Sequence, residues 1–258
     1  LSLFATGYVL LSIFKPNIPM DIFSSGVIWG SVIPTPLLSL PLFILMSEVL
    51  VAVGLGRSLF SGLAPWLGRL PGGLLHVNVV SSTLFAAVSG SSAATTAIVG
   101  KVSLPELQAR GYDRQLAMGS LAGAGTLGFL IPPSINLIIY GLLTDTSVPE
   151  LYLAGFIPGL ALAGLFMLTV IVACMYRKSW GGEAIHSTWA EKISSLSGLV
   201  PPLGIFLVVV GSIYAGVATP TEAASLGVIA AIGLAAWNRT LSIAMLKRAI
   251  EGTMRTTA

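Results

Sequence analysis

The chain has 258 residues, of which 55% are hydrophobic and only 9% are charged, and its mean hydropathy is +0.92. A soluble domain of this length carries charges on roughly a quarter of its residues, so the composition excludes an ordinary water-soluble protein and indicates lipid as the solvent. The net charge of +3 is too small and too dispersed to indicate a nucleic-acid partner. Cys174, the single cysteine, excludes a disulfide within the chain. We expect it to be packed or lipid-facing.

Six apolar segments follow one another along the chain, and a complete pass through a bilayer needs roughly 20 residues. They are residues 1–14, 37–55, 72–100, 115–143, 151–176 and 199–237. The first is short, and the second and fifth are long enough to span. The third and fourth are interrupted by glycines, serines or prolines. The last is too long for one pass, and we expect it to divide at residues 216–220.

Basic residues indicate on which side of the membrane each connecting segment lies. Because basic loops stay cytoplasmic, we predict that the basic residues of 57–69, 101–114, 177–192 and 239–255 are inside. Two segments without Lys or Arg, 145–150 and 213–221, are predicted outside. Residues 57–69 also have the pattern of an amphipathic helix on the cytoplasmic surface, with Trp66 at the interface.

The segment 72–100 has basic residues on both flanks, so both of its ends are predicted to be cytoplasmic. We therefore predict a re-entrant hairpin that turns at Gly90-Ser91-Ser92. Irregular backbone at that depth is tolerated only where protein or a water-filled cavity covers it. The first arm, ending near Ser89, would aim carbonyls at a cation, and a helix beginning near Ser92 would aim its positive end at an anion. A stripe of small residues for close helix packing explains the same pattern.

The second interrupted segment contains Gly125, Gly128, two adjacent prolines beginning at Pro132, and then Ser134 and Asn136. Adjacent prolines remove two backbone donors, and glycines weaken the helix before them. We predict that residues 128–134 are non-helical, leave carbonyls free and face the hairpin tip. The alternative is a proline kink without a binding role.

Three further positions have two interpretations each. Thr219 can cap a helix with Pro220 at its first position and Glu222 in its first turn, or Glu222 can be functional. Glu48 lies inside a spanning segment, where a carboxylate is costly and usually has a function. The alternative is that Glu48 is near enough to the helix end for its carboxylate to reach the membrane interface. His76, at the start of the hairpin, is either an interfacial, hydrogen-bonded residue or a ligand.

Two other classes of function compete with a coupled transporter. Gly90-Ser91-Ser92 with His76 could suggest an intramembrane serine hydrolase, but a nucleophile needs a base within hydrogen-bond reach. Here, His76 is expected at the far end of the hairpin arm, roughly 20 Å away at the helical rise per residue. A passive channel is the second rival, and uncoupled flux would reveal it.

An ordered set of short motifs resembles a known family. The motifs are PLFILM at 41–46, SGSSA at 89–93, RGYD at 110–113, LIPPS at 130–134, AGFIPG at 154–159 and TPTEAA at 219–224. Together they resemble the large membrane subunit of tripartite ATP-independent periplasmic (TRAP) transporters, the DctM-like family of the ion-transporter superfamily. Each motif alone is weak, whereas the ordered set runs through nearly the whole chain and is specific.

The resemblance implies an all-α membrane protein with polytopic helices, one re-entrant helical hairpin and one broken helix. These would form the first inverted repeat of an elevator-type transporter plus the start of the second. We expect spanning helices and a cytoplasmic arm helix in 1–70, the hairpin and broken helix in 71–145, and spanning helices with a cytoplasmic loop in 146–258. The second hairpin and second broken helix of the family are absent, so we expect a partial chain that does not transport alone.

The resemblance also implies a sodium-driven permease for small organic anions, such as C4-dicarboxylates or other carboxylates, in the bacterial inner membrane. Expected partners are a small membrane subunit and a periplasmic substrate-binding protein, and no organic cofactor is expected. Sodium is expected between the hairpin tip and the helix break, which contain no titratable side chain. Neutral oxygens suit a hard cation that must bind and leave. The predicted sodium-site residues are Gly90, Ser91, Ser92, Gly125, Gly128 and Pro132. The predicted substrate contacts are Ser91, Ser134 and Asn136.

Overall fold

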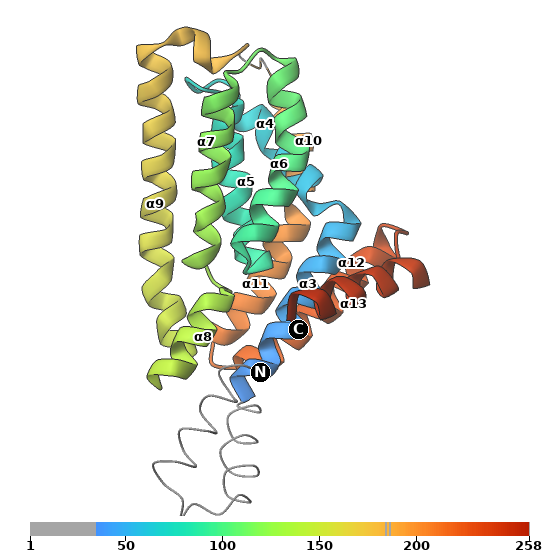
Figure 1. Cartoon of the computed structure of the whole chain (residues 1–258). Helices are drawn as coiled ribbons and strands as arrows, with labels where there is room; N and C mark the ends of the chain where they lie inside the picture. Colours follow the sequence, from blue (N-terminus) through green and yellow to red (C-terminus); the bar gives the residue numbers. More distant parts are fainter. Residues whose placement is uncertain (1–34, 184, 186, 258) are drawn as a thin grey trace, which may run out of the picture.

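A computed structural model describes residues 35–183, 185 and 187–257 of the chain. Within these residues, every regular element is a helix (Figure 1), which confirms the all-α fold class. The apolar segment expected at 1–14 lies outside the described residues. By length and apolar composition, two described helices can each cross a membrane, and two bent pairs of helices can each supply a further span.

The described chain begins with a bent pair of helices. A short 3-10 turn, η2 (Thr35–Leu38), leads into α3 (Ser39–Val53), and α4 (Leu55–Leu67) leaves it at an angle of 65°. The bend occurs at Gly54, whose φ of +88° is a left-handed conformation that glycine adopts without a steric penalty. α4 is amphipathic, as predicted, and the indole N–H of Trp66 donates to the Lys192 carbonyl at 3.1 Å.

A helical hairpin follows. Its arms are α5 (Leu74–Ser89) and α6 (Ser92–Ala109), which meet at the predicted turn. The backbone N–H of Leu74 donates to the Tyr112 hydroxyl at 3.0 Å, so the hairpin begins and ends at the same place. The prediction that the segment ends at residue 100 and that Lys101 lies in a loop was wrong. α6 continues through Lys101 and Pro105 because its exposed positions accommodate polar side chains.

The next helix is broken, as predicted. α7 (Arg114–Gly125) passes into a 3-10 turn, η3 (Thr126–Phe129), and the chain resumes as α8 (Ile135–Thr144). The non-helical part is residues 130–134, shorter than the 128–134 predicted, because Gly128 and Phe129 belong to the 3-10 turn. α9 (Val148–Tyr176) then returns along the whole molecule as an uninterrupted span, beside α7 in Figure 1. Cys174 near its end is packed, not lipid-facing.

The rest of the chain comprises η4 (Lys178–Gly181), α10 (Trp189–Ser195), η5 (Leu196–Gly198), α11 (Val200–Tyr214), α12 (Pro220–Trp237) and α13 (Ile243–Thr257). The apolar segment 199–237 therefore divides where predicted. α12 begins with the predicted cap: the Thr219 hydroxyl accepts from the Glu222 N–H, and the Glu222 carboxylate accepts from the Thr219 N–H at 2.8 Å. α12 and α13 both pack against α3 at the lower right of Figure 1.

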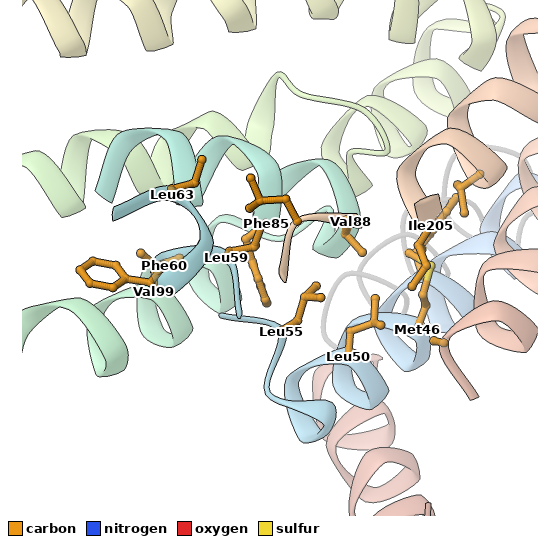
Figure 2. Close-up of a cluster of buried hydrophobic side chains, with 14 of the residues drawn as sticks. Met46, Leu50, Leu55, Leu59, Phe60, Leu63, Phe85, Val88, Val99 and Ile205 are labelled. Carbon is orange, nitrogen blue, oxygen red and sulfur yellow. The ribbon is translucent and has the colours of Figure 1, made fainter. Parts of the chain in front are cut away.

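The core joins the bent pair to the hairpin. Figure 2 shows Leu59 of α4 gathered with Phe85 of α5, and Met46 of α3 gathered with Ile205 of α11. A second, smaller cluster of mainly alanine and aliphatic side chains joins α5 to the broken helix and α9. Small side chains let helix backbones approach closely in lipid, where van der Waals packing replaces the hydrophobic effect between helices.

The connector between α9 and α10 ties the basic segments together at one end of the molecule. Its backbone accepts from Asp113 N–H and donates to the Arg110 carbonyl, both at 3.4 Å. On the other side, Ile185 N–H donates to the Gly68 carbonyl at 3.2 Å, and Arg69 donates to the Ser187 carbonyl at 2.9 Å. Three segments predicted to be cytoplasmic thus lie side by side at one end of the molecule.

We predict that both ends of the hairpin are cytoplasmic. In a background with Cys174 replaced by Ala, single cysteines at Leu70 and Gln108 should react with a membrane-impermeant thiol reagent from the cytoplasmic side only. A cysteine at Ser147, before α9, should react from the opposite side. Labelling of positions 70 and 108 from opposite sides would contradict the re-entrant hairpin.

We also predict that Thr219 stabilises α12. Thr219→Ala removes the oxygen that accepts from the Glu222 N–H, and loss of an N-cap costs about 1 kcal/mol of stability. The variant should therefore unfold at a lower temperature in a thermal-denaturation measurement, while Thr219→Ser should match the parent protein. An unchanged unfolding temperature together with lost transport would instead favour a functional role for this segment.

Candidate functional site

The hairpin tip is formed by two residues, Gly90 and Ser91, between two helix ends. Gly90 ends α5 with a φ of +63°, and its N–H donates to the Ala86 carbonyl at 2.9 Å. Ser91 is extended and caps α6, its hydroxyl accepting from the Ala94 N–H at 3.4 Å. The sequence folds this way because glycine permits the left-handed turn and serine is a preferred N-cap.

Hydroxyl groups from both arms hold the tip together. The Ser89 and Thr95 hydroxyls lie 3.0 Å apart, and both side chains are buried. Thr95 Oγ1 also donates to the Ser91 carbonyl at 2.7 Å, which the Thr95 N–H reaches at 3.0 Å. The tip is therefore a compact group of neutral oxygen atoms fixed by its own hydrogen bonds.

The helix break lies directly against this tip. The Ser92 hydroxyl donates to the Gly125 carbonyl at 2.8 Å, and the Ile135 N–H donates to the Gly90 carbonyl at 3.3 Å. These two bonds join the tip to both sides of the break. On the break itself, the Ser134 hydroxyl donates to the Phe129 carbonyl at 2.9 Å.

Glycines make this approach possible. A Cβ built at Gly128 would lie 2.8 Å from the Ser92 backbone nitrogen, and one at Gly90 would lie 2.5 Å from the Pro133 carbonyl oxygen. A Cβ at Gly125 would collide with the Thr96 hydroxyl. Side chains larger than hydrogen at these positions would force the hairpin and the broken helix apart.

The structure brings together most of the predicted site residues. Gly90, Ser92, Gly125 and Gly128 meet across the interface between tip and break, and Ser91 lies beside them at the tip. The proline carbonyl found against the tip belongs to Pro133, whereas Pro132 was the residue predicted.

The two predicted substrate contacts on α8 differ in position. Ser134 is fully buried, and its hydroxyl is bonded within the break. Asn136 is exposed on the first turn of α8. Its proposed contact with substrate therefore requires a substrate that reaches the outer face of this turn.

The site offers neutral oxygen atoms that can act as ligands to a cation. Within the described residues, no group of three or more His, Cys, Asp or Glu side chains could hold a metal ion, whereas hydroxyls and backbone carbonyls converge at the tip. Each carbonyl that accepts one hydrogen bond keeps a second lone pair. The arrangement can offer oxygen ligands to a hard monovalent cation, and the start of α6 can offer its backbone dipole to an anion.

Sequence reasoning missed three residues that support the site. Thr95 and Thr96 follow the SGSSA motif closely and were assigned no role, although Thr95 connects the two arms and Thr96 touches Gly125. The signal was their spacing, because Thr95 lies four positions after Ser91 and Thr96 four positions after Ser92, and residues four apart are neighbours on a helix. A third residue, Tyr152 of α9, is fully buried beside the Ser134 backbone, and nothing local in the sequence indicates that contact.

The other polar candidates lie elsewhere. His76 is buried, and its Nε2 lies 2.8 Å from the Pro71 carbonyl at the connector end of α5, so it is remote from the tip along that helix. The Glu48 carboxylate packs against α13, since a Cβ built at Gly252 would lie 2.8 Å from Glu48 Cδ. Glu222 is engaged in the cap of α12.

Comparison with known proteins gives a consistent result. The family described as "Tripartite ATP-independent periplasmic transporter, DctM component" matches residues 1–258. The chain is 33% identical over 199 residues to the ectoine TRAP transporter large permease protein TeaC of Halomonas elongata, covering 77% of this chain and 46% of that protein. It is 35% identical over 195 residues to the C4-dicarboxylate TRAP transporter large permease protein DctM of Pseudomonas aeruginosa, covering 75% and 45%.

A third relative is the isethionate TRAP transporter permease protein DctMQ of Oleidesulfovibrio alaskensis, 33% identical over 218 residues, which are 81% of this chain and 33% of that protein. The chain thus spans about half the length of most of the curated relatives it matches, and a third of this one. The match over every residue, together with a hairpin whose tip closes on a broken helix, identifies the chain as a membrane protein of the DctM family of TRAP transporter permeases, a family of transporters and not of enzymes.

Proposed function

We propose that this chain supplies one half of the translocation site of a sodium-coupled permease that imports small organic anions. The contact between the hairpin tip and the helix break carries the proposal. There, two interrupted helices meet through Ser92 and Gly125, and through Gly90 and Ile135. Paired interrupted helices with free backbone groups are how secondary transporters hold ions and substrates near the middle of the membrane.

The ligand chemistry favours sodium over a proton as the coupling ion. A proton-coupled site needs a side chain that can gain and lose a proton in the working pH range. The side chains and carbonyls of the tip and the break offer only hydroxyls, the amide of Asn136 and backbone carbonyls. Sodium would take Ser91, Ser92 and carbonyl oxygens near Gly125 and the prolines as ligands.

The proposed substrate class has support from two of the relatives and from the geometry of the hairpin tip. Dicarboxylates and isethionate, named for two of the relatives, are small organic anions. The N-terminus of α6, capped by Ser91, can receive an acidic group of this kind. Because the relatives are named for different substrates, including ectoine, we propose small organic anions as a class and not one compound.

The proposed assembly contains further proteins. A small membrane subunit would lie beside this chain, and a periplasmic binding protein would deliver the substrate, as the tripartite family description implies. The proposed location is the bacterial inner membrane. The predicted side for the connector and the hairpin ends is then the cytoplasm.

We predict that the Ser92 hydroxyl contributes to sodium binding. In the complete transporter, Ser92→Ala should raise the half-saturating sodium concentration for uptake about tenfold, because an oxygen ligand to a charged ion is lost. Ser197→Ala is the matched control, since that exposed hydroxyl is bonded only to the Ser194 carbonyl. Uptake should be measured with radiolabelled substrate at varied sodium concentration and should require the sodium gradient.

Glu48→Gln tests the competing coupling ion. The variant should keep its sodium dependence, because Glu48 packs against α13. Uptake that is driven by a pH gradient in sodium-free buffer and abolished by Glu48→Gln would show that the coupling site has been placed wrongly. Flux without any coupling gradient would favour a passive channel.

We predict that Gly128 cannot carry a side chain without loss of transport. In Gly128→Ala, the new methyl group would lie 2.8 Å from the Ser92 nitrogen, so the tip and the break must separate. Uptake should fall by at least about fivefold, because such overpacking costs roughly 1–3 kcal/mol. Gly119→Ala on α7, where a Cβ meets open space, should transport normally. Equal uptake by both variants would refute the tight contact.

A further inference from the structure

A pocket of about 320 Å³ lies beside the end of α9, away from the proposed translocation site. Its lining includes Arg69, Pro71, Gly72, Met175, Lys178 and Gly182. The buried thiol of Cys174 also lines the pocket, and Gly72 lies directly over it, since a Cβ built there would be 3.2 Å from the sulfur. The lining of the pocket therefore combines apolar side chains, glycine backbone and two cationic side chains.

The two cations come from elements far apart in the sequence. Arg69 follows α4, and Lys178 begins the turn after α9. The neighbouring Arg177 is stacked on the Trp180 ring at 5.1 Å. A cation directly after α9 suits the negative end of that helix. Arg69 likewise lies just past the C-terminus of a helix, α4, so the two cations reach the pocket from two different helix ends.

Neither cation is neutralised within the described part of the chain. The ion pairs formed there are Arg110 with Glu106 and Lys247 with Glu251. Arg69 donates one hydrogen bond to the Ser187 carbonyl, which is neutral, so the positive charge of the guanidinium stays uncompensated. Two uncompensated cations beside one pocket favour an anionic ligand.

An apolar surface leads away from the pocket along α9. Met175, which lines the pocket, lies seven residues after Leu168 and three after Val172, so the three side chains share one face of the helix. Their exposed fractions are 67%, 53% and 58%, respectively. A shallow groove of about 470 Å³ on the same helix is lined by residues 168, 169, 172, 173 and 176. A ligand with an anionic head and an apolar tail matches both surfaces at once.

We infer that this pocket binds the headgroup phosphate of an anionic glycerophospholipid, with an acyl chain along the exposed face of α9. The pocket lies at the end of the molecule where the basic segments gather, which is where headgroups of the cytoplasmic leaflet are found. Basic pockets between membrane helices on that side are suited to such headgroups. The inference does not depend on the substrate or coupling ion of the transporter.

Lipid retention by the complete protein tests this site. The protein would be purified in detergent with equal amounts of phosphatidylglycerol and phosphatidylethanolamine, and bound lipid would be counted by native mass spectrometry. Wild-type protein should retain phosphatidylglycerol preferentially. Lys178→Gln and Arg69→Gln should each reduce that retention about fivefold. Arg114→Gln, which removes an exposed cation outside the pocket at the start of α7, should not.

A second pair of variants tests the acyl-chain contact. Met175→Gln should weaken retention, whereas Leu153→Gln, at a similarly exposed apolar position toward the other end of α9, should leave it unchanged. Millimolar inorganic phosphate should fail to displace the lipid; displacement by phosphate would show a site for free anions. Unchanged phosphatidylglycerol retention in both Lys178→Gln and Arg69→Gln, with both proteins monodisperse by size exclusion, would overturn the proposal.

Discussion

Backbone hydrogen bonding in lipid is the constraint on which the rest of this structure depends. Water is absent from the bilayer core, so an interrupted helix must find partners for its freed N–H and C=O groups inside the protein. The hairpin tip and the helix break are two such interruptions, and each supplies partners for the other. The Gly90 carbonyl accepts from Ile135, and the Gly125 carbonyl accepts from Ser92. Neither irregular segment would be stable at membrane depth without the other, and the backbone oxygens gathered by this pairing are what make a site possible.

Much of the fold could be predicted because the relevant signals are local. Apolar runs, basic flanks and helix-breaking residues are read directly from the sequence, and they placed the hairpin turn, the helix break and the division between α11 and α12. The cap at Thr219 also followed from four adjacent residues. The length of α6 could not be predicted in the same way. A lysine after an apolar run is typical of a loop, and the sequence alone does not show which residues pack around Lys101. In the structure, it lies at an exposed position of a helix whose other side is packed.

The sequence predicted which types of residue form the site, but it predicted less well which of their atoms are in contact. Glycine, serine and proline mark where the backbone departs from a helix, which identified the two halves that meet. Which carbonyl faces the tip depends on the path of the chain through the break, and it is that of Pro133. The outward position of Asn136 and the burial of Tyr152 beside Ser134 depend on how α8 and α9 rotate against the hairpin. Such rotations are set by packing between distant segments, which no local pattern encodes.

The connector after α9 is held by two groups of bonds of unequal length. Its first part meets the hairpin end through Arg110 and Asp113 at 3.4 Å, and its second part meets the end of the bent pair through Gly68 and Arg69 at 3.2 and 2.9 Å. Longer hydrogen bonds are weaker. If the hairpin ever shifted relative to α4, the bonds at the hairpin end would open first. The connector would then keep its bonds to Gly68 and Arg69 and stay with α4 while the hairpin moved.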